Sequence, residues 1–167
     1  EIKPDSVDAN VAQARLLASD GKADDALKQL DGLLAKVPNA TDALQLKGNL
    51  LQQTKGDLAG AVQVYRKALE VRSDLPEAHA ALIAAAFAQR DVDGAAKQLE
   101  ELKKVLPNHP QTKYFEAQVA FAKGDFAKAR ELVQPLLRAA PEHAGLLHLA
   151  GATEFKLNAT AQAESYL

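Results

Sequence analysis

The sequence predicts an all-α fold, an α-solenoid in which short helices pair into antiparallel hairpins that repeat along the chain. Columns of small, bulky, glycine-like and proline residues recur about every 34 residues in one common register. Within each repeat, apolar residues lie three and four positions apart over two segments of about 14 residues, which is the period of an amphipathic helix. No segment alternates between apolar and polar residues strictly enough to predict a strand.

The repeat columns define the hairpins. The first column contains alanine: Ala26, Ala61, Ala95, Ala129 and Ala163. The second is suited to a left-handed turn between the two helices of a hairpin: Gly21, Gly56, Arg90, Gly124 and Asn158. The third is bulky and the fourth is rich in proline: Leu30, Tyr65, Leu99, Val133 and Leu167, then Pro4, Pro38, Ser73, Pro107 and Pro141. Four columns in one register are hard to produce by chance.

Helices are expected, in chain order, at residues 7–20, 23–36, 41–54, 58–71, 76–89, 93–106, 110–123, 126–139, 144–157 and 160–167. Pro76 and Pro110 suit the first turn of a helix, where the missing N–H costs nothing. Residues able to cap the following helix are Asp5, Asn39, Asp74 and Asn108. The connections are too short for anything except antiparallel neighbours.

The second hairpin carries one extra residue. Gly48 and Gly56 are eight positions apart, whereas Ala14 and Gly21 in the first hairpin are seven apart. The insert lies within residues 52–55 and predicts either a looser turn or a single π-bulge at the end of the helix.

Composition excludes several classes of protein. The 167 residues include 20 basic and 22 acidic side chains, a net charge of −2 that gives no surplus for nucleic-acid binding. The absence of cysteine excludes disulfides, thiolate metal sites and cysteine nucleophiles, and leaves the redox compartment open. The longest apolar run, residues 80–88, is far shorter than the ~20 residues of a transmembrane helix, so no membrane insertion is expected in this segment.

No constellation of residues predicts catalysis, and we expect the protein not to be an enzyme and to hold no cofactor or metal. The four histidines, His79, His109, His143 and His148, show no His-x-x-x-His spacing and are expected to be solvated or to cap helices. Neighbouring carboxylates such as Asp24 and Asp25 point apart on a helix. No glycine-rich phosphate loop follows a strand.

A 34-residue helical hairpin with alanine, glycine and proline columns resembles the tetratricopeptide repeat (TPR) family. Matching small residues of the first helices are Ala14, Gly48, Ala117 and Gly151, whereas Ile83 stands in the third repeat. The resemblance covers the whole chain and implies a right-handed α-solenoid of about 4.5 repeats. The implied boundaries are the tail of a preceding repeat at 1–6, repeats at 7–40, 41–75 (with the insert), 76–109 and 110–143, and a partial repeat at 144–167.

In this family the first helix of each hairpin lines a concave groove that holds a protein or peptide. The resemblance therefore assigns partner-binding positions to Arg15, Asn49, Phe87, Tyr114, Gln118, Phe121, His148 and Phe155. Phe87, Phe121 and Phe155 recur every 34 residues and predict an aromatic stripe, which either anchors a guest or packs against neighbouring helices. A carboxylate clamp is not expected, because only Arg15 and Asn49 match its residue types.

Two stretches, residues 114–126 and 148–167, are similar to bacterial TPR lipoproteins that accompany exosortase (PEP-CTERM) and exopolysaccharide systems. This similarity implies a periplasmic or outer-membrane-anchored location through a region before Glu1, and a cytoplasmic location otherwise. The expected function is a non-enzymatic interaction scaffold, which would bind protein or peptide in envelope or exopolysaccharide assembly. The alternative is a structural or saccharide-contacting spacer in a periplasmic assembly. The oligomeric state stays open.

Overall fold

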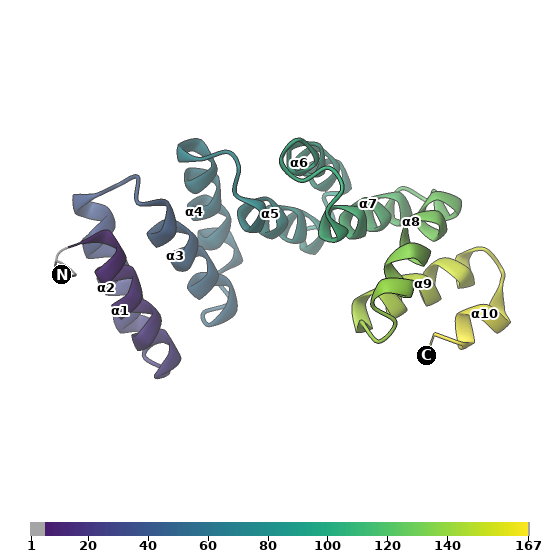
Figure 1. The fold of residues 1–167 in the computed structure, drawn as a ribbon, viewed down its shortest axis with the longest axis horizontal. Coiled ribbons are helices and arrows are strands. Elements are labelled where there is room, and N and C mark those ends of the chain that lie inside the picture. The colour runs from purple at the N-terminus through teal and green to yellow at the C-terminus, as the bar shows by residue number, and fades with distance from the viewer. Residues whose placement is uncertain (1–5, 167) are drawn as a thin grey trace. The chain divides into compact units, whose positions relative to one another are not determined.

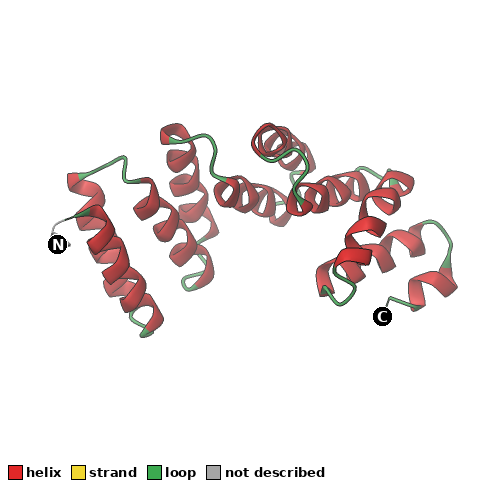
Figure 2. Ribbon diagram, in the orientation of Figure 1, coloured by secondary structure: helices red, strands yellow, loops and turns green. Residues whose placement is uncertain are grey.

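The computed structural model describes residues 6–166, which contain ten α-helices and no strand. Figure 2 shows these helices and the loops that join them. The helices are α1 (Val7–Ser19), α2 (Ala23–Lys36), α3 (Thr41–Gln53), α4 (Leu58–Val71), α5 (Pro76–Ala88), α6 (Val92–Val105), α7 (Pro110–Ala122), α8 (Phe126–Ala139), α9 (Ala144–Lys156) and α10 (Thr160–Glu164). The chain forms two compact units, residues 1–85 and 86–167, and each is described by itself.

The predicted all-α fold is confirmed, and the predicted helix ends agree closely with the structure. Every helix from α1 to α9 starts and stops within one residue of the predicted limits. Helix α10 is shorter than expected, because it ends at Glu164 and is followed by a turn. Pro4, Asp5 and Leu167, which belong to the predicted columns and caps, lie outside the described residues.

The turn within each hairpin has the predicted left-handed backbone. Positive φ angles occur at Gly21 (76°), Gly56 (65°), Arg90 (59°), Gly124 (82°) and Asn158 (59°). In the first hairpin, the N–H of Lys22 donates to the carbonyl of Leu17, five residues earlier. After the insert, Asp57 N–H donates to Leu51, six residues earlier, and no π-helix is present among the described residues. The extra residue is therefore accommodated as a looser turn.

The predicted caps of the first helices are wrong by one position. Asn39, Asp74 and Asn108 each lie two residues before the helix begins, whereas the capping residue is the next one along. Ser6 caps α1 by accepting from Ala9 N–H, and His109 caps α7 by accepting from Gln111 N–H. Ala40 precedes α3 without a side-chain cap, so hydrophobic packing rather than capping determines where that helix starts.

The first unit contains α1 to α4 and most of α5, with two apolar clusters between them. In Figure 1, α1 and α2 form one antiparallel pair and α3 and α4 the next. The cluster between α1, α2 and α3 includes Val11, Ala14, Ala26, Leu30, Leu33 and Leu46. The cluster around α4 includes Leu44, Ala61, Tyr65, Ala68, Leu75 and Leu82. The alanine and bulky columns are thus core positions, as a helical hairpin requires.

The second unit contains α6 to α10 and repeats this packing. Its cluster includes Ala117, Val133, Leu137, Leu146, Leu149 and Ala150, which come from α7, α8 and α9. Figure 1 shows α7, α8, α9 and α10 following one another as antiparallel neighbours. The first helices α7 and α9 also contact each other.

Candidate functional site

The surface that the repeat pattern assigns to a partner is shared by two first helices of the second unit. We define the α7–α9 face by Tyr114, Gln118 and Phe121 of α7 and by their repeat equivalents His148, Ala152 and Phe155 of α9. Residues three, four and seven apart lie on one side of a helix, which brings each set of three together. The two sets lie on helices that contact each other.

Tyr114 is the most constrained side chain of this face. Its hydroxyl accepts a hydrogen bond from Gln118 Nε2 at 3.0 Å, and its ring meets that of His143 edge-on at 6.1 Å between centroids. Gly145 leaves room for it, because a Cβ there would lie 2.9 Å from the Tyr114 hydroxyl. Burial raises the pKa of the Tyr114 hydroxyl.

The two aromatic rings that follow Tyr114 differ in what they contact. Phe121 is half-buried and packs edge-on against Phe126 of α8, with 5.4 Å between ring centroids. Phe155 is 63% exposed and lines a cavity of about 270 Å³ together with Leu147, His148, Gly151, Ala152 and Ala163. Phe121 therefore stabilises the hairpin, whereas the ring of Phe155 is available to a guest.

Three predicted partner-binding residues lie elsewhere in the chain. Arg15 is exposed on α1, beside Leu16, which is 66% exposed. Asn49 on α3 is half-buried, and its Oδ1 accepts a hydrogen bond of 2.5 Å from the Tyr65 hydroxyl, so it already supports the first unit. Phe87, near the end of α5, is half-buried. Their role in holding a partner stays a prediction.

The histidines show one departure from expectation. His109 and His143 accept backbone N–H groups at the starts of α7 and α9, each at 3.3 Å, and His148 is exposed. His79 is neither solvated nor a cap: it is buried, and its Nε2 lies 2.8 Å from the carbonyl oxygen of Ser73. The sequence pattern missed this because the partner is a backbone group in the preceding loop.

Sequence reasoning also missed two groups of charged residues between helices. Glu154 of α9 is almost fully buried and accepts two hydrogen bonds from the guanidinium of Arg130 on α8, one of them from Nε at 2.8 Å. Glu116 of α7 lies among three lysines. Apart from Lys113, which lies three positions before Glu116 on α7, these partners are more than ten positions apart in the sequence, so local spacing does not predict the pairs.

The described part of the chain has neither a metal-binding cluster nor a membrane-spanning helix. None of its histidines and carboxylates gather in a group of three that could hold a metal ion. Its helices are also too short or too polar to cross a lipid bilayer.

Known proteins that resemble the chain share its fold. A tetratricopeptide repeat family profile matches residues 11–76 and 114–167, and a second profile of that description matches residues 54–119. No curated protein is significantly similar in sequence.

Solved structures superpose on nearly the whole chain at low sequence identity. A tetratricopeptide repeat protein from Parabacteroides merdae has a TM-score of 0.82 at 14% identity; the match covers 99% of this chain and 64% of that one. MamA from Desulfovibrio magneticus has a TM-score of 0.80 at 19% identity, with 96% and 90% covered. YrrB, described as a TPR protein with an unusual peptide-binding site, has a TM-score of 0.78 at 18% identity, with 98% and 84% covered.

Proposed function

The chain belongs to the tetratricopeptide repeat family, and we propose that it is a non-enzymatic scaffold whose α7–α9 face holds an extended or helical segment of another protein. The observation that carries this proposal is the exposed ring of Phe155 beside a cavity of about 270 Å³, which residues of α9 and α10 line at the α9 side of this face. Aromatic anchors next to a pocket are the residues that dominate protein interfaces.

Burial of apolar surface against a guest would stabilise the complex. Covering an exposed phenylalanine ring contributes roughly 1.5 to 3 kcal/mol, enough to change a dissociation constant by more than tenfold. Tyr114 and Gln118 supply hydrogen-bonding groups on α7, near the start of α9, which suits the backbone of a segment that runs along the face from there to Phe155. YrrB, a protein with the same fold, has an unusual peptide-binding site.

The test compares two exposed hydrophobic residues of similar accessibility. Peptides are selected from a displayed library on the wild-type protein, and their affinities are then measured for Phe155→Ala and Leu16→Ala. We expect Phe155→Ala to weaken the selected peptides at least tenfold and Leu16→Ala to leave them unchanged. Peptides that bind Phe155→Ala as tightly as wild type would contradict the proposal.

A second candidate function follows from the same exposed ring. A saccharide-contacting spacer would stack sugar rings on Phe155, and titration with soluble glycans would then shift the NMR signals of that ring. Shifts with glycan and none with the selected peptides would favour the spacer.

The cellular role and location of the scaffold are proposed from sequence similarity alone. Residues 114–126 and 148–167 resemble bacterial TPR lipoproteins of exosortase and exopolysaccharide systems, so we propose a role in envelope or exopolysaccharide assembly, in the periplasm or anchored to the outer membrane. Fractionation of cells that express this protein from its own gene tests this, and recovery in the cytoplasm would contradict it.

A further inference from the structure

A second concave site lies on the other side of α7. A cleft of about 460 Å³ runs between α6, α7 and α8. Its apolar lining includes Leu99, Val119 and Ala120. On α7, Val119 and Ala120 are rotated by well over 90° from Tyr114, at 100° per residue, so the cleft is separate from the α7–α9 face.

The cleft is open because the long side chains that fill the equivalent space one repeat later are replaced here by alanines. The residues at the corresponding place between α8 and α9 are Arg130 and Glu154, whose long side chains fill the space with an ion pair. Thirty-four residues earlier, these positions hold Ala96 and Ala120, which both line the cleft. The two places therefore share the same helix packing, but between α6 and α7 small alanine side chains leave the space open.

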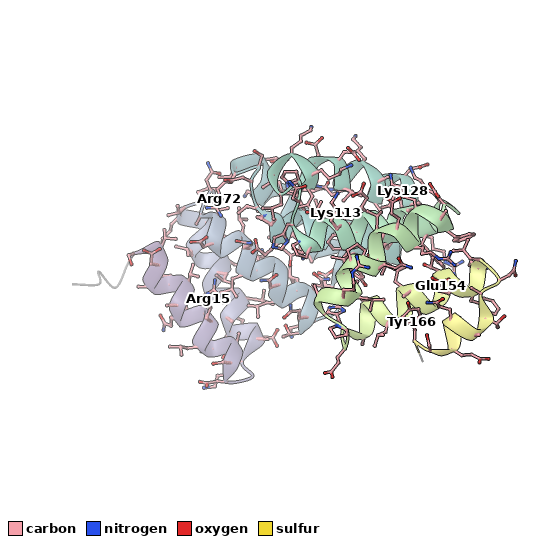
Figure 3. All side chains as sticks on the ribbon, turned by 45° about the vertical axis from the view of Figure 1, so that its right-hand side comes forward. Arg15, Arg72, Lys113, Lys128, Glu154 and Tyr166 are labelled. Carbon is pink, nitrogen blue, oxygen red and sulfur yellow. The ribbon has the colours of Figure 1, made fainter. Side chains whose placement is uncertain are left out.

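Lysines from three helices meet at this cleft around one carboxylate. The Glu116 carboxylate lies 3.1 Å from Lys113 Nζ, 3.7 Å from Lys103 Nζ and 3.9 Å from Lys128 Nζ. The side chain of Glu116 is only 14% exposed, so it lies beneath the lysines. In Figure 3, labels mark Lys113 on α7 and Lys128 on α8.

The charged residues of this cluster are not repeated in the next repeat of the chain. The equivalents of Lys103, Lys113, Glu116 and Lys128, one repeat later, are all uncharged: Leu137, Leu147, Ala150 and Gln162. Lys103 also pairs with Glu100 at 3.2 Å, so two carboxylates face three ammonium groups. Partial burial would raise the pKa of Glu116, but the hydrogen bond from Lys113 and the charges of Lys103 and Lys128 hold it below its usual value, which keeps the cluster ionised.

The outer edge of the cleft carries further positive charge. Lys97 has no ion-pair partner among the described residues, and Lys123 reaches only the highly exposed Asp93, at 3.9 Å. Of the three acidic lining residues, Glu100 pairs with Lys103 at 3.2 Å, Glu116 lies beneath lysines, and Asp125 accepts the backbone N–H of Lys128 as the cap of α8. Acidic groups of a guest would therefore find lysines that are not fully neutralised.

We propose that this cleft binds an acidic segment of a partner protein. An apolar side chain of the segment enters between α6 and α7 and contacts Leu99 and Val119, while its carboxylates pair with Lys97, Lys123 and Lys128. A peptide fits better than a nucleic acid, because no aromatic residue lines the cleft and single-stranded nucleic acids need rings on which their bases stack.

The first experiment measures binding by fluorescence anisotropy. The probe is a labelled peptide in which each leucine is followed by two glutamates, and the comparison peptide has glutamine at every glutamate. We expect the acidic peptide alone to bind, and Lys97→Glu combined with Lys123→Glu to weaken it about tenfold, since each exposed ion pair contributes up to about 1 kcal/mol. The matched control, Lys156→Glu, changes an exposed lysine of α9 outside the cleft.

The second experiment fills the cleft with the ion pair of the next hairpin. Ala96→Arg combined with Ala120→Glu is expected to keep the helical circular dichroism and to abolish binding of the acidic peptide. If that variant fails to fold, the lysine variants decide the matter. Unchanged binding after the lysine substitutions, equal binding of the glutamine peptide, or tighter binding of single-stranded oligothymidylate would each overturn the proposal.

Discussion

The ring of Tyr65 on α4 lies against Gly48 on α3. A Cβ added at Gly48 would lie 2.7 Å from Tyr65 Cε1 and 2.8 Å from Cζ, closer than real carbon atoms approach. The ring cannot easily move aside, because Tyr65 is only 2% exposed and its hydroxyl donates to Asn49 Oδ1. Glycine at this position therefore lets the two helices of the hairpin pack with a tyrosine between them.

Gly48→Ala is expected to lower the free energy of unfolding by about 1 to 3 kcal/mol, because overpacking outweighs the helix propensity gained. Gly32→Ala is the matched control: Gly32 lies inside α2 with nothing within 4 Å of the added Cβ. It should raise the free energy of unfolding by up to about 1 kcal/mol. Urea denaturation measures both, and equal effects of the two substitutions would contradict the packing described for Tyr65.

The alanine column makes a second prediction about packing. Ala129 is completely buried in α8, and Ala129→Leu should lower the free energy of unfolding by about 1 to 3 kcal/mol through overpacking. Ala127→Leu, on the exposed side of the same helix, should change it by less than about 0.5 kcal/mol. A melting temperature that Ala129→Leu leaves unchanged would show that the repeat register is wrong.

The ion pair between Arg130 and Glu154 predicts a non-additive result. Arg130→Met leaves the buried Glu154 carboxylate without its partner and should lower the melting temperature clearly. Glu154→Leu added to Arg130→Met removes that charge and should restore much of the loss, because an apolar pair of similar size also fills the space. If the double variant is as unstable as the sum of both single variants, the two side chains do not act as a pair.

Glu116 predicts how stability depends on pH. The pKa of Glu116 is lower in the folded protein than its ordinary value, so the ionised carboxylate stabilises the fold. This stabilisation is complete at pH values above the ordinary pKa and is lost as the pH falls through the pKa of the folded protein. Glu116→Gln should therefore lower stability at pH 7 and reduce the loss between pH 7 and about pH 3. Glu142→Gln, at an exposed carboxylate, is the control. If the stability of Glu116→Gln and that of the wild type change with pH in parallel, Glu116 does not form the ionic cluster described above.

Much of the fold could be predicted from the sequence because its signals are local and repeated. The positive φ angles at Gly21 and Asn158 follow from the turn column, and the ends of α1 to α9 follow from the apolar period. The caps were misplaced because Asn39 and Asn108 are good capping residues that stand one position too early, while the true positions hold Ala40 and His109.

The surfaces were harder to predict, because they depend on pairs that are distant in sequence. Repetition at 34 residues identified Phe121 and Phe155 together, yet only the structure separates the ring that packs on Phe126 from the ring that is exposed. The three lysines around Glu116 come from three helices, so no spacing in the sequence indicated a cluster.

The central claim is that the α7–α9 face is where a partner segment binds. Two-dimensional NMR of the labelled protein with a library-selected peptide tests it most directly, through the chemical shifts of aromatic rings and backbone amides. The account predicts that the ring signals of Phe155 and Tyr114 and the amides of α9 shift most. Shifts confined to residues outside α7 and α9 would contradict it.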